Sequence, residues 1–510
     1  QRCEGTMSGR YPASTARVAL LASVFVCSAR TGGAQTTAGA ETRFQPLPCT
    51  SAFGGSVPGI PETAVRCGTV VVPQNRRTPN NASLQSVVLP VVVYSMPGAN
   101  GTPLLFLAGG PGESSIEGLQ KVFLRTTTGQ LALRERPIIA FDPRGHSPVF
   151  DRASPELGNI LFRPRNPRSL AIAPLRDSLA KRTADLKKHG VDPANFTTRE
   201  VIEDIADVSR ALHYEKLVLF GVSYGSHYAL RFMDTHPTMV EASILDAVAP
   251  PEATQLLDSS FVATAGRAIV QQIVADCRTD AFCATQYQDL TGAVASLLGA
   301  TSIRKTVIAP GTGDWRTLEV SGPTVLSVLG ISSGSDDVLA NVPRIITQFV
   351  ASDTLRDDLS PRVVIAAAVD PALQTATWQA VPLTYWVTLC GDRPNGEPLA
   401  TSRQLCDVLG VPYDGEKASA PVRSDIPALL ISSGYDAQTP AALADSAARL
   451  LSRSQRVHFA RVGHVAFARN TVMACAATII QSFLQRPDQQ PPTACVNTVA
   501  PAFMPRGDIK

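Results

Sequence analysis

The chain has 510 residues, a length that allows one large domain or two modest domains. Its formal net charge is only +3 and it contains no long basic run, so a nucleic acid is not expected as a partner. Hydrophobic residues make up 44% and aromatic residues 6% of the chain, which is typical of a globular protein with a buried core.

The N-terminal segment has the pattern of an export signal. Arg10 and Arg17 precede an apolar run over residues 18–26, and Gly32-Gly33-Ala34 offers small residues for cleavage. The run is too short to cross a bilayer, so we expect no stable membrane anchor. We therefore predict a signal peptide over residues 1–34, with additional residues ahead of Met7, and a secreted or periplasmic protein. A buried first helix is the alternative interpretation.

The cysteines support export to an oxidising compartment. Two of the ten, Cys3 and Cys27, lie in the segment that would be removed, which leaves an even number. Eight cysteines allow 105 connectivities, and the spacing favours four local pairs. These pairs are Cys49–Cys67, Cys277–Cys283, Cys390–Cys406 and Cys475–Cys495. No C-x-x-C pair or His/Cys cluster indicates a metal, so structural disulfides are predicted and no metal or cofactor is expected.

Several short apolar runs follow a linker predicted over residues 35–48. Residues 69–72 and 86–94 are expected to be strands, as are 103–107 and 137–141. The third run leads directly into Ala108-Gly109-Gly110-Pro111-Gly112, and the fourth leads into Asp142-Pro143-Arg144-Gly145. Thr197 and Glu200 have the spacing of a capping box, which predicts the start of a helix.

The stretch over residues 216–225 organises the rest of the chain. Residues 217–220 are apolar without alternation, as expected of a strand buried on both faces. Gly221-Val222-Ser223-Tyr224-Gly225 then fits G-x-S-x-G, and a helical apolar spacing follows over residues 226–235. A strand that turns into a helix through this motif is a nucleophile elbow. A second match ends at Gly334, but polar residues follow it, so we interpret its Ser332 as part of a loop.

The alternation of strands and helices is lost between residues 250 and 420. Helices are predicted over residues 261–277 and 338–350, with a hairpin over 305–320. Alternation then resumes with strands at 428–432 and 456–462 and helices at 440–451 and 471–484. We predict an α/β-hydrolase fold, a mostly parallel central sheet with helices on both faces. Its core would comprise residues 49–249 and 421–510, and residues 250–420 would form a large, mainly helical cap over the carboxyl ends of the strands.

In this fold class the catalytic acid follows the serine in the chain, and the histidine follows the acid. Asp436 comes after the strand at 428–432 and is predicted to be the acid. Asp246 also ends a strand and is the rival candidate, although the residues after it are interpreted as the exit into the cap. His464 follows the strand at 456–462 and is predicted to be the base.

Three other histidines are given structural interpretations. His458 lies inside a predicted strand, whereas His227 and His236 belong to the helix after the elbow.

The predicted chemistry is acyl transfer through Ser223. A serine hydroxyl becomes a good nucleophile only when a neighbouring imidazole takes its proton, and a carboxylate orients that imidazole. The oxyanion that forms needs preorganised N–H donors. We expect them from Tyr224, the residue after the nucleophile, and from the loop that contains Gly109 and Gly110.

These motifs resemble those of the secreted tripeptidyl-aminopeptidase and proline-iminopeptidase-like α/β-hydrolases. The similar stretches are Leu-Ala-Gly-Gly-Pro-Gly at 107–112, Asp-Pro-Arg-Gly at 142–145, Gly-Val-Ser-Tyr-Gly-Ser at 221–226, Leu-Asp-Ala-Val-Ala-Pro-Pro at 245–251, Asp436 with Thr439-Pro440, Gly463-His464, and the cysteine spacings. The resemblance runs from about Cys49 to Cys495. It implies a serine peptidase that binds the free N-terminus of a short peptide beneath its cap.

The chain departs from the family pattern at three places. Ala108 stands where the family usually has His, and Pro143 stands where it has Gln. Cys390-Gly391-Asp392 stands where the family has Cys-Ser-Glu, whose acid is implied to contact the substrate amine. The resemblance therefore points to Asp392 as a substrate-binding residue, and a solvated loop acid is the alternative.

Two enzymatic functions use the same residues. The first is a secreted serine hydrolase that cleaves peptides from the N-terminus, and the second is a carboxylesterase that acts on small acyl esters. A non-catalytic binding protein is the third hypothesis, and the complete set Ser223, Asp436 and His464 in the expected order argues against it.

Overall fold

A computed structural model describes most of the chain after residue 42. The described residues are 43–49, 53, 55–79, 81, 83–146, 172–253, 259–308, 315–355, 360, 363, 383–392, 406–412, 418–499 and 503–505. The predicted signal peptide and most of the predicted linker lie outside these residues. None of the helices in this part of the chain has the length and apolarity needed to cross a membrane.

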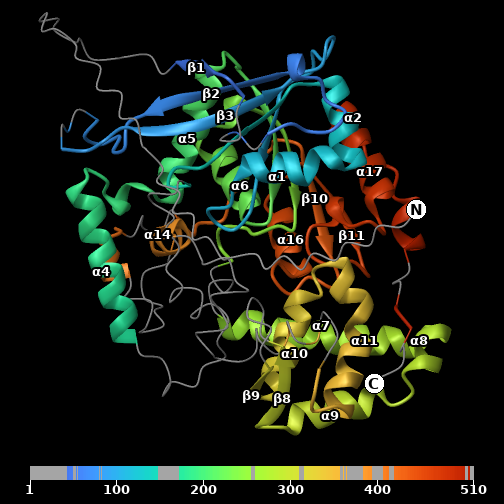
Figure 1. Cartoon of the computed structure of the whole chain (residues 1–510). Coiled ribbons are helices and arrows are strands. Elements are labelled where there is room, and N and C mark those ends of the chain that lie inside the picture. Colours follow the sequence, from blue (N-terminus) through green and yellow to red (C-terminus); the bar gives the residue numbers. More distant parts are fainter. Residues whose placement is uncertain are drawn as a thin grey trace, which may run out of the picture. The chain divides into compact units, whose positions relative to one another are not determined.

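A nine-stranded sheet forms the centre of the molecule (Figure 1). Its strands are β1 (Phe44–Leu47), β2 (Val65–Val72), β3 (Val87–Tyr94), β4 (Leu104–Leu107), β5 (Ile138–Phe141), β6 (Leu217–Val222), β7 (Val240–Asp246), β10 (Ala428–Ser433) and β11 (Ser454–Phe459). Their order across the sheet is β1-β2-β3-β5-β4-β6-β7-β10-β11. The pairs from β1 to β5 by way of β2 and β3 are antiparallel, and all pairs from β5 through β4 to β11 are parallel. This order is that of an α/β-hydrolase sheet with one additional strand, β1, at the edge.

Helices cover both faces of this sheet. One face packs against α5 (Thr198–Ala211), α6 (Tyr224–Thr235) and α16 (Ala441–Ala448), and the other packs against α1 (Ser115–Lys121), α2 (Thr127–Glu135) and α17 (Met473–Gln485). Successive residues of β6 alternate between the two cores, so that Leu219 joins the first and Phe220 the second. Because both faces are buried, the strand needs apolar residues at every position.

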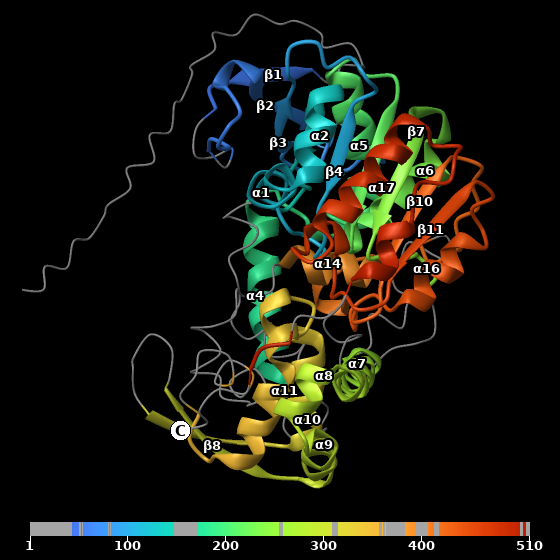
Figure 2. The same ribbon diagram turned by 90° about the vertical axis from the view of Figure 1, so that its right-hand side faces the viewer.

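A mainly helical segment is inserted between β7 and β10, and Figure 2 shows its elements below the sheet. Its helices are α7 (Ser259–Thr279), α8 (Ala281–Gln286), α9 (Leu290–Gly299), α10 (Gly322–Ser332), α11 (Asp336–Ala351) and α14 (Leu383–Gly391), and β8 (Ile303–Ile308) pairs antiparallel with β9 (Trp315–Val320). Most of these elements share a separate apolar core. α7 and α10 cross closely at Gly266 and Gly330, where a side chain on either residue would overlap the backbone of the other helix.

The remaining helices are short or stand apart from the layers described above. They are α4 (Ile172–Lys188) and the 3-10 turns Glu62–Ala64, Phe123–Arg125, Pro193–Asn195, Pro237–Met239, Ala466–Ala468 (η7) and Ala494–Thr498.

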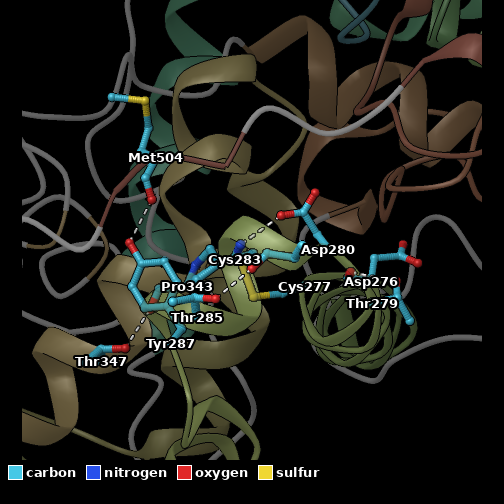
Figure 3. Close-up of a disulfide and its surroundings, with 11 residues drawn as sticks. Asp276, Cys277, Thr279, Asp280, Cys283, Thr285, Tyr287, Pro343, Thr347 and Met504 are labelled. Carbon is cyan, nitrogen blue, oxygen red and sulfur yellow. Dashed lines mark hydrogen bonds between the residues drawn. A yellow bond between two sulfur atoms is a disulfide. The ribbon is translucent and has the colours of Figure 1, made fainter.

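Four disulfides join the cysteine pairs that the spacing favours. They are Cys49–Cys67, Cys277–Cys283, Cys390–Cys406 and Cys475–Cys495. Figure 3 shows the bridge between α7 and α8, where Asp280 caps α8 by accepting a hydrogen bond from the Cys283 N–H at 2.7 Å. Each bridge closes a short loop of 6 to 20 residues in sequence separation. Such bridges fasten local turns and do not connect distant parts of the fold.

The structure differs from several sequence predictions at element ends. Phe44–Leu47 form an edge strand paired with β2, so the predicted linker is wrong for these residues. β11 ends at Phe459 and not at residue 462, which places a four-residue turn before His464. Ser332 ends helix α10 and does not lie in a loop, because apolar residues along the helix pack into the core of the inserted segment. The helices α1, α2 and α14 were not predicted from the sequence.

Candidate active site

Ser223 lies on a sharp turn between a buried strand and a helix. Its backbone has φ 54° and ψ −123°, a conformation that is strained for a residue with a side chain. The turn fits only because Gly225 has no side chain, since a Cβ there would overlap the carbonyl oxygen of Leu107 in the adjacent strand. The serine side chain remains partly exposed. The turn therefore presents its hydroxyl at the carboxyl edge of the sheet.

Asp436 and His464 form a hydrogen-bonded pair at the same edge. The Nδ1 atom of His464 lies 2.7 Å from Oδ2 of Asp436, whose carboxylate is completely buried. The same carboxylate accepts hydrogen bonds from the N–H groups of Gln438 and Thr439 and from the Thr439 hydroxyl. These donors fix the carboxylate in one orientation, and the carboxylate in turn orients the imidazole.

Burial and charge act in opposite directions on this pair. Burial tends to lower the pKa of His464, but the charge and hydrogen bond of Asp436 outweigh it and raise that pKa above its ordinary value. Burial tends to raise the pKa of Asp436, but His464 and the bonds from Thr439 bring it below its ordinary value. The arrangement therefore favours an ionised Asp436 beside an imidazole that accepts a proton readily.

Asp246 connects the serine turn to the histidine loop. Its carbonyl oxygen accepts a hydrogen bond from the Ser223 N–H at 2.9 Å. Its carboxylate accepts bonds from the N–H groups of Ala466 at 3.1 Å and Phe467 at 2.8 Å, directly after His464. The intervening Val465 has the left-handed φ of 68°, which a β-branched residue rarely adopts. Among the described residues no hydrogen bond joins Ser223 directly to His464. Asp246 connects the two segments, because it accepts hydrogen bonds from the backbone of Ser223 and from the backbone that follows His464.

The carboxylate of Asp246, the rival candidate for the acid, ends among the backbone donors of η7. Burial raises the pKa of this carboxyl to about 6. It makes no hydrogen bond to His464 and so is not placed as the partner of that imidazole.

Gly109 and Gly110 form a loop against the serine. A Cβ built on Gly109 would stand 3.0 Å from Cβ and 3.4 Å from Oγ of Ser223, so the bare backbone of this loop approaches the nucleophile closely. Tyr224 begins α6, and its N–H lies in the first turn, where backbone donors have no partner within the helix. The structure thus brings together the three residues predicted as oxyanion donors.

A buried carboxylate binds the start of α1, which follows the glycine loop in the chain. Asp142 accepts hydrogen bonds from the Ser114 hydroxyl at 2.7 Å and from the Ile116 N–H at 3.1 Å. The adjacent Arg144 is fully buried and binds both carboxylate oxygens of Asp204 on α5. A buried pair of this kind is costly to break from one side only. The Asp-Pro-Arg-Gly motif therefore fastens the loop after β5 to both neighbouring segments.

Asp392 lies beneath the side chain of Tyr224 rather than at the solvent surface. It is 6% exposed, accepts a hydrogen bond from Thr198 at 2.8 Å, and is bound by the Tyr224 hydroxyl. His227 lies 3.6 Å away, and burial lowers the pKa of this histidine to about 3, so its imidazole is neutral. The structure thus joins Asp392 to the residue after the nucleophile. The alternative of a solvated loop acid is wrong.

The three histidines that were given structural interpretations lie away from the Asp436–His464 pair. His227 is buried within α6, whereas His236 contacts Glu203 at 3.1 Å. His458 bonds to the hydroxyl of Ser432 across the β10–β11 pair at 3.0 Å.

Comparisons with known proteins find similarity to peptidases and other hydrolases. A family model described as TAP-like protein matches residues 393–495, which include Asp436 and His464. Tripeptidyl aminopeptidase of Streptomyces coelicolor is 24% identical over 194 residues, 37% of this chain and 36% of the relative. Serine protease Hip1 of Mycobacterium tuberculosis is 26% identical over 231 residues, 42% of each chain. The match thus spans less than half the length of these relatives.

Solved structures match more of the chain at lower identity. A proline iminopeptidase of Mycobacterium smegmatis covers 82% of this chain and 98% of its own, with 13% identity and a TM-score of 0.36. A thermophilic esterase of Thermogutta terrifontis covers 82% of this chain and 99% of its own, with 13% identity and the same TM-score of 0.36. The fold assignment rests on the strand order and the elbow described above. The family model and the sequence relatives confirm the predicted resemblance: this chain has an α/β-hydrolase fold and is similar to tripeptidyl-aminopeptidase-like serine hydrolases.

Proposed function

We propose that this chain is a secreted serine hydrolase that cleaves peptides from their N-terminus. The observation that carries the proposal is the position of Ser223 on a strained turn at the sheet edge where Asp436 and His464 are hydrogen-bonded to each other. Four disulfides support export. The relatives named as peptidases support a peptide substrate.

The proposed reaction has two acyl-transfer steps. His464 takes the proton of the Ser223 hydroxyl as its oxygen attacks the scissile carbonyl, and Asp436 stabilises the imidazolium that forms. The N–H of Tyr224 and the Gly109–Gly110 loop hold the oxyanion. The imidazolium then gives its proton to the leaving amine, and water releases the acyl group from Ser223 by the reverse sequence.

The first experiment compares peptide amides with esters on the full chain and on Ser223→Ala. We expect cleavage of p-nitroanilides that have a free N-terminus, and a loss on the order of 10⁴-fold or more in Ser223→Ala. Ser332→Ala is the matched control, because Ser332 has the same G-x-S-x-G context but ends a helix of the inserted segment. Its activity should equal that of the unaltered chain.

Other results would change the proposal in specific ways. Turnover of p-nitrophenyl esters without cleavage of any amide would replace the peptidase by the alternative carboxylesterase. Activity that survives in Ser223→Ala would remove the assignment of the nucleophile.

A further inference from the structure

An acidic side chain stands beside the predicted oxyanion loop and has no role in the mechanism above. Glu113 follows Gly109-Gly110-Pro111-Gly112 directly. A Cβ built on Gly110 would lie 3.2 Å from Cγ of Glu113 and 3.0 Å from its backbone nitrogen. A Cβ built on Gly109, one residue earlier, would likewise lie 3.0 Å from Cβ of Ser223. Glu113 and the nucleophile therefore contact adjacent residues of one loop.

Glu113 is exposed to solvent and lies within electrostatic range of other groups of the site. Its side chain is exposed to solvent, yet burial by the surrounding protein raises the pKa of its carboxyl above the ordinary value. The charge of His464 acts in the opposite direction on this pKa, so the carboxyl lies within electrostatic reach of the predicted base. In the described part of the chain, no hydrogen bond stabilises its carboxylate.

Asp392, the acid indicated by the family resemblance, is in a different situation. Its carboxylate binds the hydroxyls of Thr198 and Tyr224 and lies near His227, all within the protein. A substrate ammonium would have to displace these hydroxyls in order to reach it. Of the two acids, Glu113 is the exposed one, and its Cγ lies close to Gly110, the neighbour in the chain of the glycine that approaches Ser223.

We propose that Glu113 binds the free α-ammonium group of the substrate and limits cleavage to the removal of a single N-terminal residue. This inference rests on the proposed peptidase function and deepens it. A carboxylate without a protein partner is suited to an ammonium group, because charge-assisted hydrogen bonds are the strong ones.

Distance favours one residue over three. In a substrate with one residue before the scissile bond, the amine is separated from the reacting carbonyl carbon by a single Cα. Each further extended residue adds about 3.3–3.6 Å, so the amine of a tripeptidyl substrate lies roughly 7 Å farther away. Glu113 contacts Gly110, and Gly110 is predicted to bind the oxyanion of that same carbonyl. The near amine is therefore the one that this side chain can reach.

The test compares Glu113→Gln with the unaltered full chain on four substrates. They are the p-nitroanilides of alanine, N-acetylalanine and trialanine, and p-nitrophenyl acetate. We expect alanine p-nitroanilide to be preferred, and its kcat/KM relative to that of the ester to fall roughly 10- to 100-fold in Glu113→Gln, mainly through KM. Glu113→Asp should recover part of this loss. Glu117→Gln is the matched control, because Glu117 is an exposed acid of α1 whose carboxylate lies 2.9 Å from the ammonium of Lys121.

A binding measurement separates this inference from the proposed function. Alaninamide should inhibit ester hydrolysis competitively, N-acetylalaninamide should not, and Glu113→Gln should abolish the difference. If Glu113→Gln is still inhibited by alaninamide and not by N-acetylalaninamide, as the unaltered chain is, the role of Glu113 is overturned. A preference for the trialanine substrate would overturn the one-residue limit. Ester turnover that requires Ser223, without amide cleavage and without inhibition by alaninamide, would remove the peptidase proposal and this inference together.

Discussion

The hydrogen bond between Asp436 and His464 makes the proposed activity depend on pH in a defined direction. Neutral imidazole is the form that takes a proton from Ser223, so protonation of His464 abolishes the reaction. Asp436 raises the pKa of this imidazole above the ordinary value of about 6.5. We therefore expect kcat/KM to fall as the pH decreases, with a midpoint above 6.5. Measuring kcat/KM for the ester substrate from pH 5 to 9 checks this expectation.

Asp436→Asn provides the control for this pH profile. Loss of the negative charge should lower the pKa of His464 and shift the midpoint to lower pH, while the maximal rate falls by about 10⁴ because the tautomer is no longer fixed. A midpoint that stays in place in the variant would show that His464 is not the titrating group.

Single residues differ in how far the sequence could predict them. Asp436 and His464 could be identified because each follows a strand and because their order along the chain is fixed in this fold class. Their hydrogen bond is found where that order predicts it. Glu113 and Asp392 carry no such signal. Their surroundings depend on which hydroxyls and backbone atoms the folded chain brings to them, and spacing along the sequence does not contain this information.

At the scale of elements, Asp246 holds η7 and the histidine loop against the end of β7. Asp246→Ala leaves the N–H groups of Ala466 and Phe467 without an acceptor, and each such buried donor costs about 1–3 kcal/mol. Val465 would then be free to leave its left-handed conformation. We expect a lower melting temperature and at least a tenfold loss of kcat on every substrate alike, since displacement of His464 by about 1 Å can cost about 100-fold.

Asp336→Ala is the matched control for this variant. Asp336 also accepts a hydrogen bond from a backbone N–H, that of Asn470 at 2.8 Å, but at an exposed position beyond η7. Its loss should leave kcat nearly unchanged. An Asp246→Ala variant with normal kcat would contradict the positioning role, whatever its stability.

Most elements of the sheet could be predicted because they are apolar at every position. This pattern identifies β4, β5, β6 and β10 within one or two residues. The end of β11 and the edge strand β1 were missed, since Ala460 and Arg461 form a turn despite the surrounding apolar residues and β1 has polar and exposed positions. Pairing with a neighbour makes β1 a strand, and an edge strand needs no continuous apolar run.

At the scale of the whole molecule, the inserted segment could be outlined from the sequence but not connected to the core. Its helices α7 and α11 were predicted from their apolar spacing, and its β-hairpin from a Pro-Gly turn. Tyr435 and Ala437 pack into the apolar core of the inserted segment, and single polar groups add to this connection. The Tyr435 hydroxyl donates to Asp276 on α7, and Arg461 lies 3.7 Å from the same carboxylate. Such contacts leave no periodic signal in either segment.

Tyr435 therefore provides a test of whether the inserted segment influences the predicted triad. Tyr435 is fully buried and directly precedes Asp436, and its N–H donates to Val462 in the turn before His464. Tyr435→Phe keeps the ring but removes the hydrogen bond to Asp276, a loss of about 1.5–3 kcal/mol for a bond to a charged group. We expect a lower melting temperature together with a several-fold loss of kcat/KM on peptide amides.

Tyr287→Phe is the control that separates a general loss of stability from the loss of the hydrogen bond between Tyr435 and Asp276. The Tyr287 hydroxyl also donates a hydrogen bond, to the carbonyl of Met504 at 2.9 Å, and Tyr287 lies in the inserted segment near the Cys277–Cys283 disulfide (Figure 3). It should therefore lower the melting temperature without lowering kcat/KM. If both variants lose the same fraction of activity, the effect of Tyr435→Phe is one of general stability. If only Tyr435→Phe loses activity, the hydroxyl couples α7 to the loop of Asp436, and the position of the inserted segment helps to set the geometry of the acid.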